Sequence, residues 1–477
     1  MRHRLVLVNP PFQRRVRRVA QTSVGPPLGL AYLAAVARRA GHEVAIVDAN
    51  ALGLSFAESA RRVRALAPTV VGLTATTPTV DLAGAIAAAL GSGARRAPIL
   101  LGGPHGTALP ARTLAEQPAV DMVARGEGEA TLPLLLARLD GGPLDTSALA
   151  EVPGLAFRGQ GGEVVDTGVA APIADLDSLP EPARDLLPNH RYRCPDSERF
   201  STLLGMRGCP YRCVYCAVPG MFGRQVRFRD PGAVVAELAG AHARFGVEFF
   251  SFLDDTFTTR RAWVEAFCDA ARRAGLPGQV RWICLTRADL VDRALLATMK
   301  AAGCVRIELG VESGSEAGRA FLDKGLEDGQ ILEAFHSARE VGLSTMGFAI
   351  LNIPGETEAD EARTFELLAR ADPDFLQVSL LTPYPGTPLR ALAEERGWIS
   401  TDDWARYSFL NDVVLDHGVP AATICARHRA FLRRFYLRPR TALKLGRLVL
   451  SGTTRLRPLA RTVALGLTGA WGGGGER

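Results

Sequence analysis

Hydrophobic and polar residues alternate along the first 140 positions in a pattern that predicts short strands interleaved with helices. The expected strands, each a short apolar run, lie near 4–8, 43–47, 69–73, 98–101 and 121–124. The expected helices, in which apolar residues recur at helical spacing, lie near 28–40, 56–66 and 79–90. Strands that alternate with amphipathic helices through short loops favour a parallel, doubly wound α/β sheet. Such a sheet binds ligands beyond the carboxyl ends of its strands.

A second, longer alternation begins near residue 196 and predicts six β/α repeats. Its strands are expected near 201–206, 248–253, 280–285, 305–309, 345–351 and 375–380. Its helices are expected near 231–244, 260–274, 291–302, 329–341 and 357–370. Six parallel repeats suggest a partial, partly open (β/α)6 barrel with its chemistry at the carboxyl ends of the strands.

The remaining segments differ from both alternations in composition. Residues 141–195 are rich in Pro, Gly and Asp, which indicates a linker with a small hairpin at 154–166. The chain from residue 396 onward is Arg-rich and reads as mostly helical. We therefore expect a Rossmann-like domain over 1–140, a linker over 141–195, a barrel over 196–395 and a basic helical region over 396–477.

The overall composition is that of a folded protein with a sizeable core. The chain has 477 residues, of which 47% are hydrophobic and 22% charged, so two or three domains are expected. Five of its eight cysteines are scattered, which is not a disulfide framework and indicates a reducing, cytoplasmic location. No apolar run approaches the ~18 residues that a membrane span needs.

The net charge of +6 is concentrated near the C-terminus, where no acidic residue occurs between His417 and Gly475. Arg440, Lys444 and Arg447 fall at i, i+4 and i+7, so a helix through them presents a cationic stripe. Leu445, Leu448 and Val449 would lie on the opposite side, an arrangement that suits either packing on the barrel or peripheral contact with a membrane. No nucleic-acid motif accompanies the arginines, and a nucleic-acid partner is not expected.

The strongest chemical signal is the spacing Cys209-x3-Cys213-x2-Cys216, directly after the first strand of the second alternation. Three thiolates on one loop can hold three corners of a [4Fe–4S] cluster and leave the fourth iron open, whereas an electron-transfer ferredoxin supplies four cysteines. A zinc knuckle would need a fourth Cys or His nearby, and no histidine occurs between 190 and 242. We interpret the three cysteines as cluster ligands.

This spacing, with Tyr215 before the last cysteine, resembles the signature of radical S-adenosylmethionine enzymes, and the polar strand ends recur in that family's order. The resemblance implies that the open iron chelates the methionine moiety and that Tyr215 lies against the adenine. It suggests Asp254, Arg287, Glu308 and Glu312 as contacts of S-adenosylmethionine; loop carboxylates of this kind also commonly cap helices or form ion pairs. Asn352 departs from the family, which often has glycine before Ile-Pro-Gly-Glu-Thr.

The first alternation resembles the cobalamin-binding domain that precedes the radical module in a large subclass of these enzymes. The matching segments include Thr74-Ala-Thr76-Thr-Pro and Leu101-Gly102-Gly103-Pro104-His105. Glycines at strand ends let a ligand approach the backbone, and Thr74 or Thr76 can hydrogen-bond it. The D-x-H-x-x-G motif that supplies histidine to cobalt elsewhere is absent, so neither His42 nor His105 is expected on the metal. A nicotinamide site is disfavoured because no G-x-G-x-x-G follows the first strand.

The resemblance implies a cobalamin-dependent radical methyltransferase that methylates an unactivated carbon of a small molecule, apolar or anionic, and takes electrons from a flavodoxin- or ferredoxin-type donor. The alternatives are a radical cyclase of the same architecture, such as the anaerobic magnesium-protoporphyrin monomethyl ester cyclase, a ring-rearranging relative, and, more remotely, an iron–sulfur carrier or sensor. A methylthiotransferase is disfavoured because only Cys194 precedes the triad. No acid–base catalytic residue is identified, since the cofactors carry the hard chemistry.

Overall fold

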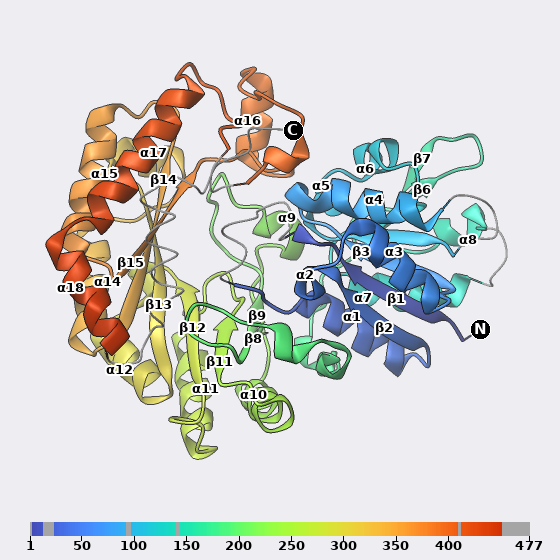
Figure 1. The fold of residues 1–477 in the computed structure, drawn as a ribbon, viewed down its shortest axis with the longest axis horizontal. Helices are drawn as coiled ribbons and strands as arrows, with labels where there is room; N and C mark the ends of the chain where they lie inside the picture. Colours follow the sequence, from blue (N-terminus) through green and yellow to red (C-terminus); the bar gives the residue numbers. More distant parts are fainter. Residues whose placement is uncertain (1, 13–22, 92–96, 140–143, 409–411, 451–477) are drawn as a thin grey trace.

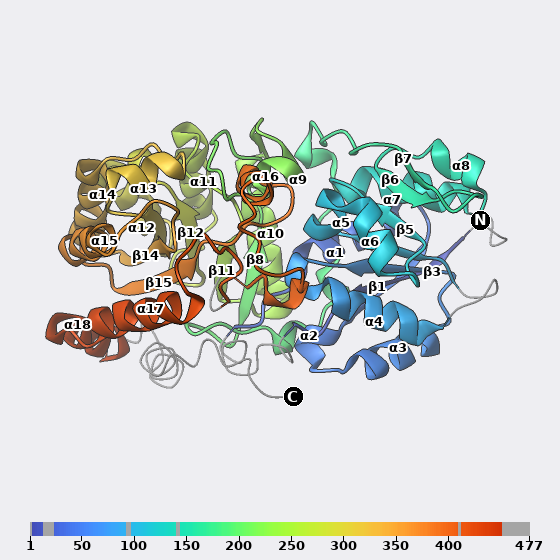
Figure 2. The same ribbon diagram turned by 90° about the horizontal axis from the view of Figure 1, so that it is seen from above.

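The computed structural model describes residues 2–12, 23–91, 97–139, 144–408 and 412–450 (Figure 1). Two α/β units lie side by side, and the α/β architecture expected from the alternation of strands and helices is confirmed (Figures 1 and 2). Within the described residues, no helix combines the length and the apolar character needed to cross a membrane.

The N-terminal unit is a seven-stranded sheet of order β2-β1-β3-β4-β5-β6-β7. Its strands are β1 (Arg4–Asn9), β2 (Glu43–Asp48), β3 (Val70–Thr74), β4 (Ile99–Gly102), β5 (Met122–Ala124), β6 (Leu155–Arg158) and β7 (Val164–Asp166). The first five are parallel, and the middle residues of the central strands β1 and β3 are buried and apolar because both faces of the sheet are covered. The hairpin expected at 154–166 is present as β6 and β7, and it extends this sheet in antiparallel fashion.

Helices cover both faces of this sheet. They are α1 (Leu28–Arg39), α2 (Ala49–Leu52), α3 (Phe56–Ala65), α4 (Val80–Leu90), α5 (Pro104–Ala108), α6 (Pro110–Glu116), α7 (Gly128–Arg138) and α8 (Thr146–Ala150). The apolar sides of α3 and α4 form one core with the sheet, and those of α1, α7 and α8 form a second core. The sheet is therefore doubly wound, with its strand ends open between the two helical layers.

The second unit is an all-parallel sheet of order β15-β14-β13-β12-β11-β8. Its strands are β8 (Phe200–Leu203), β11 (Phe249–Phe252), β12 (Arg281–Thr286), β13 (Cys304–Glu312), β14 (Ser344–Leu351) and β15 (Phe375–Leu380). The covering helices are α10 (Pro231–Phe245), α11 (Arg261–Arg273), α12 (Arg293–Ala301), α13 (Glu316–Phe321), α14 (Asp328–Glu340) and α15 (Glu358–Ala371). In the described residues the end strands β8 and β15 pair on one side only, so the partly open barrel is confirmed.

Side-chain caps mark the start of several barrel helices. Asp230 accepts the backbone N–H of Ala233 in the first turn of α10, and Asp292 accepts that of Leu295 in the first turn of α12. Thr357 begins α15 in a capping box with Asp360. A cluster of aromatic rings that includes Phe252, Phe267 and Trp282 fills the space between α11 and the sheet.

The C-terminal region contains α16 (Pro388–Glu395), α17 (Ala421–Tyr436) and α18 (Pro439–Leu450), and the last two lie along the outside of the barrel (Figure 2). The segment before α17 runs back to the N-terminal unit, where Trp404 and Tyr407 join its core. Two residues of the cationic stripe expected on α18 have an acidic partner within the molecule. Arg440 and Lys444 form ion pairs with Asp372 at 2.9 and 2.7 Å, and the Arg440 side chain is 69% exposed.

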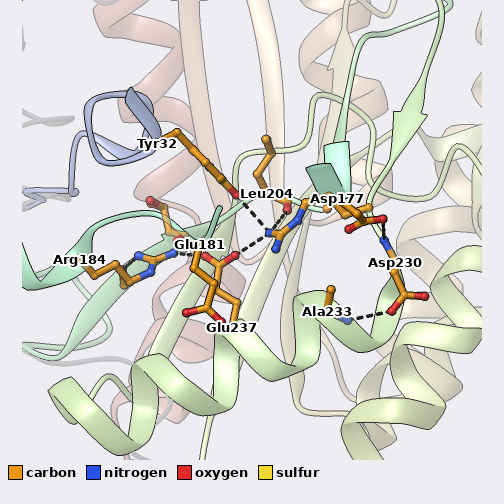
Figure 3. Close-up of polar contacts among 12 residues, drawn as sticks. Tyr32, Asp177, Glu181, Arg184, Leu204, Asp230, Ala233 and Glu237 are labelled. Carbon is orange, nitrogen blue, oxygen red and sulfur yellow. Dashed lines mark hydrogen bonds and ion pairs between the residues drawn. The ribbon is translucent and has the colours of Figure 1, made fainter. Parts of the chain in front are cut away.

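The two units are joined by buried charges around Glu237 of α10 (Figure 3). Its two carboxylate oxygens pair with Arg184 at 2.5 Å and with Arg229 at 2.6 Å. Arg229 also donates to the hydroxyl of Tyr32 on α1 at 3.1 Å. Because an unpaired buried charge is costly, this network holds helix α1, the 141–195 segment and the barrel in one arrangement.

Candidate functional site

The three motif cysteines lie on a loop closed by a two-stranded stem. Strands β9 (Met206–Arg207) and β10 (Arg227–Phe228) pair antiparallel at the base of residues 208–226. Gly208 has φ +96°, and a Cβ there would lie 2.4 Å from the carbonyl oxygen of Gln225. Only glycine therefore lets the stem close immediately before Cys209.

A first cavity, of about 400 Å³, opens between this loop and the carboxyl ends of β12 to β15. Its walls include all three motif cysteines and Tyr215, Arg287 and Glu312. Apolar side chains form much of the rest, among them Val218, Leu285, Phe348, Ile350, Leu380 and Leu381. This is the size and character of a pocket for a drug-sized ligand with a few polar anchor points.

A polar triad stands in this cavity, centred on Glu312. Its Oε1 accepts a hydrogen bond from the Tyr215 hydroxyl at 3.0 Å and one from Lys324 Nζ at 2.8 Å. Glu312 holds a left-handed backbone, φ +64°, after a register shift in β13, which is the kind of local irregularity found at functional sites. A Cβ at Gly310 would lie 2.3 Å from this carboxylate, so glycine keeps room for the triad.

Arg287 lines the cavity but its guanidinium already has partners. Nε and Nη2 donate to the two carboxylate oxygens of Asp289, both at 3.0 Å, and Nη1 donates to the Lys324 carbonyl at 2.9 Å. The guanidinium lies 3.8 Å from the ring centroid of Tyr211. The bidentate face expected for a ligand carboxylate is thus occupied by Asp289, and Arg287 presents its charge and stacked face instead.

Two acids expected at the ligand have their carboxylates engaged elsewhere and are not among the cavity's lining residues. Asp254 accepts hydrogen bonds from the backbone N–H of Gly205 at 3.0 and 3.1 Å, as a loop-bracing acid does. Glu308 lies 3.4 Å from Arg306 in an ion pair. The neighbouring Asp255 lines the cavity instead, and burial raises the pKa of its carboxyl to about 7.

The three motif cysteines line one cavity, as ligands of one cluster would. Cys209 is buried beside Thr256, and burial raises the pKa of the Cys216 thiol to about 12, so metal binding has to displace its proton. Among the described residues no three His, Cys, Asp or Glu side chains are grouped to hold one metal ion. A cubane spreads three thiolates over three irons and does not need them to meet at one point. Cys268, Cys284 and Cys304 belong to the barrel core.

A second cavity, also about 400 Å³, lies at the strand ends of the N-terminal sheet. Thr74, Thr76, Gly102 and Gly103, the four residues expected to bind cobalamin, all line it. Gly103 has φ +103°, and a Cβ there would lie 2.6 Å from the Ala75 carbonyl oxygen. Only glycine fits at this position, which leaves the backbone of the cavity wall bare. The cavity is largely apolar and has glycines in its wall at the strand ends, which lets a ligand such as the tail of cobalamin approach the backbone closely.

The two histidines lie outside the residues that line this cavity. His42 Nδ1 accepts from the backbone N–H of His3 at 3.1 Å. His105 is buried, with Nδ1 3.3 Å from the Thr77 hydroxyl and its ring edge-on to Trp404. Burial lowers the pKa of His105 to about 4.

The short helix α9 (Val218–Phe222) separates the two cavities. Val218 lines the first cavity, whereas Met221 and Phe222 line the second. Thr107 of α5 lies within 3.5 Å of the Met221 sulfur, which fixes α9 against the N-terminal unit. The loop that bears the cysteines therefore supplies a wall of both cavities.

The cavity lining also contains Lys324 and Asp255, which the sequence motifs did not single out as ligand contacts. Lys324 belongs to no motif and reaches Glu312 only through the fold. Asp255 is adjacent to Asp254, and what distinguishes the two is that Asp255 lines the cavity whereas Asp254 does not. Asn352 has φ +67°, a conformation that glycine and asparagine tolerate, which explains its place where the family has glycine.

Comparison with known proteins agrees with both halves of this arrangement. Residues 203–385 match the family model of the Radical SAM superfamily, and residues 15–136 match that of the B12 binding domain. An uncharacterised methyltransferase of Pyrococcus horikoshii is 32% identical, over 92% of this chain and 94% of the relative. An anaerobic magnesium-protoporphyrin IX monomethyl ester cyclase of Cereibacter sphaeroides is 30% identical, over 91% of this chain and 70% of the relative.

Among solved structures, the radical S-adenosylmethionine methyltransferase TsrM from Kitasatospora setae, with cobalamin and a [4Fe–4S] cluster bound, has the same fold. The TM-score is 0.68 at 21% identity, covering 84% of this chain and 76% of TsrM.

Proposed function

The chain belongs to the cobalamin-dependent radical S-adenosylmethionine methyltransferases, and we propose that it methylates an unactivated carbon of a small molecule. The cofactors of this family are a [4Fe–4S] cluster, S-adenosylmethionine and cobalamin. When bound, these cofactors supply two things: a 5′-deoxyadenosyl radical, which removes a hydrogen atom from the substrate, and a methyl group, which is delivered to the resulting carbon radical.

In this proposal Cys209, Cys213 and Cys216 hold the cluster in the first cavity. Tyr215 and Glu312 bind S-adenosylmethionine beside it, with Lys324 orienting the Glu312 carboxylate and Arg287 adding positive charge. In the second cavity Thr74, Thr76, Gly102 and Gly103 hold cobalamin. The family's need for an external electron donor of flavodoxin or ferredoxin type carries over to this chain.

The observation that supports methyl transfer most is the shared wall. A substrate carbon must meet a radical formed in one cavity and a methyl group held in the other. The five-residue helix α9 contributes Val218 to the first cavity and Met221 and Phe222 to the second. An electron carrier or sensor would have no use for a second ligand cavity next to its cluster. The largely apolar lining of the first cavity favours a substrate whose reacting part is apolar.

A radical cyclase is the second candidate because a cyclase relative is 30% identical over most of the chain. The two are separated by anaerobic reconstitution with S-adenosylmethionine carrying a deuterated methyl group, followed by mass spectrometry of products from a small-molecule extract. We expect a product that has gained one labelled methyl, together with 5′-deoxyadenosine. Formation of 5′-deoxyadenosine with products of unchanged carbon count would favour cyclisation or rearrangement.

A further inference from the structure

Four buried charges connect the stem of the cysteine loop to the second cavity. Arg207 of β9 and Arg227 of β10 are directly paired across the stem. Both reach Glu127, where Arg207 Nη1 lies 3.0 Å from Oε2 and Arg227 Nη2 lies 2.5 Å from Oε1. The second guanidinium nitrogen of Arg207 lies 2.5 Å from Glu129 Oε1. We call Glu127, Glu129, Arg207 and Arg227 the stem bridge.

The stem bridge is shielded from solvent and balanced in charge. Its four residues are between 2% and 8% exposed, and two arginines face two glutamates. Arg227 also donates to the carbonyls of Phe222 and Ile173, at 2.8 and 2.7 Å. Removing one member leaves an uncompensated buried charge, which is far more costly than loss of a surface pair.

The same residues form part of the second cavity. Glu127, Glu129 and Arg207 line it, together with Phe222 of α9. Glu127 and Glu129 stand at the start of α7, and Glu127 follows closely on strand β5. The rim of a corrin carries amide side chains, each with donors and an acceptor, and these match carboxylate and guanidinium groups.

We propose that the stem bridge binds the amide-bearing rim of cobalamin and thereby transmits its occupancy to the cysteine loop. The proposal rests on the proposed function, because it needs cobalamin in the second cavity. Cobalamin that contacts Glu127, Glu129 and Arg207 stabilises their paired arrangement. Arg207 and Arg227 hold the two strands of the stem, and the stem positions the loop that lines the first cavity. Binding of cobalamin and of S-adenosylmethionine is therefore coupled, and linkage makes the coupling equal in both directions.

The test measures the affinity of the full-length, cluster-reconstituted protein for S-adenosylmethionine, with and without hydroxocobalamin, under anaerobic conditions without reductant so that no turnover occurs. For the wild type we expect hydroxocobalamin to tighten S-adenosylmethionine binding by a factor within the roughly 5- to 150-fold range of measured couplings. In Glu127→Gln the factor should fall to about one.

Two further variants keep the result interpretable. Glu127→Gln with Arg227→Gln restores charge balance, since Arg207 and Glu129 remain paired, and it should fold well yet still lack coupling. Glu237→Gln is the matched control, because it also removes a buried carboxylate with two arginine partners at the boundary between the units, but its partners Arg184 and Arg229 lie outside the paired strands β9 and β10 (Figure 3). It should lose stability and keep the coupling.

Coupling that survives in both Glu127 variants, or is lost equally in Glu237→Gln, would overturn the stem bridge. So would a wild type that binds hydroxocobalamin without any effect on S-adenosylmethionine, and the proposed function would then stand. A wild type that does not bind hydroxocobalamin would remove both proposals together.

Discussion

At the scale of single residues, Glu312 is the acceptor on which Tyr215 and Lys324 converge, and it is the first position to test. Glu312→Gln keeps the shape and removes the charge. Loss of a hydrogen bond to a charged group costs about 1.5–3 kcal/mol, so S-adenosylmethionine should bind roughly ten- to a hundredfold more weakly. Isothermal titration calorimetry on the reconstituted protein measures this.

Glu308→Gln is the matched control, because Glu308 lies on the same strand but pairs with Arg306 outside the cavity lining. This substitution should leave the affinity for S-adenosylmethionine nearly unchanged. Equal effects of the two substitutions would assign Glu312 a structural role only.

The three motif cysteines should each be indispensable to the cluster. Alanine at Cys209, Cys213 or Cys216 should abolish the charge-transfer absorption of the reconstituted protein and the formation of 5′-deoxyadenosine. Cys268→Ala should change neither, since that thiol is packed in the barrel core. Loss of the absorption in Cys268→Ala would show that the ligand assignment is wrong.

His105 should make the protein sensitive to mild acid. Burial lowers the pKa of His105 from 6.5 to about 4, so between these values the unfolded chain binds a proton that the folded chain does not. Stability therefore falls as the pH drops below 6.5, by about 1.4 kcal/mol for each pH unit from this residue. Urea denaturation between pH 7 and 5 should show a shallower pH dependence in His105→Gln than in the wild type, and parallel curves would contradict this origin.

Residue types were predictable from the sequence where spacing defines the chemistry, as for the cysteines, or where a family resemblance singles out a segment, as for the glycines of the second cavity. The directions in which side chains point could not be predicted from the sequence. Asp254 and Asp255 are neighbours after the same strand, and the backbone N–H of Gly205, distant in sequence, captures one of them. Lys324 donates a hydrogen bond to Glu312 because the chain turns back after α13, and no local sequence pattern predicts this turn.

At the scale of elements, the strands and helices follow the period of their apolar residues closely, because each buries one face or one stripe. The periodicity of α18 does not show whether its cationic side packs on the barrel or contacts a membrane, because the sequence suits both. The structure adds Asp372 as an acidic partner for this side. Asp372 is a buried acid that follows α15 in a left-handed conformation with φ +52°.

Asp372→Asn tests this element, since asparagine tolerates the left-handed backbone and removes the charge. The wild type should stay in the supernatant with anionic vesicles at low salt, because Arg440 and Lys444 are already paired. The variant should release these cations and co-sediment with anionic but not neutral vesicles. Strong salt-sensitive sedimentation of the wild type would show that the tail is a membrane contact despite these pairs.

At the scale of the whole molecule, function depends on the way in which two units share one loop. The sequence identifies both units, but the loop between Gly208 and Gln225 becomes a common wall only when β9 and β10 close it and α9 packs on α5. This juxtaposition depends on long-range packing and could not be predicted from the motifs separately.

The most direct test of methyl transfer follows the methyl group itself. The anaerobically reconstituted protein is incubated with reduced cobalamin and S-adenosylmethionine carrying a deuterated methyl group, and the extracted cobalamin and nucleosides are analysed by mass spectrometry. The account predicts deuterated methyl on the cobalamin and, with reductant, 5′-deoxyadenosine from the same preparation. Formation of 5′-deoxyadenosine while the cobalamin never acquires label would contradict it.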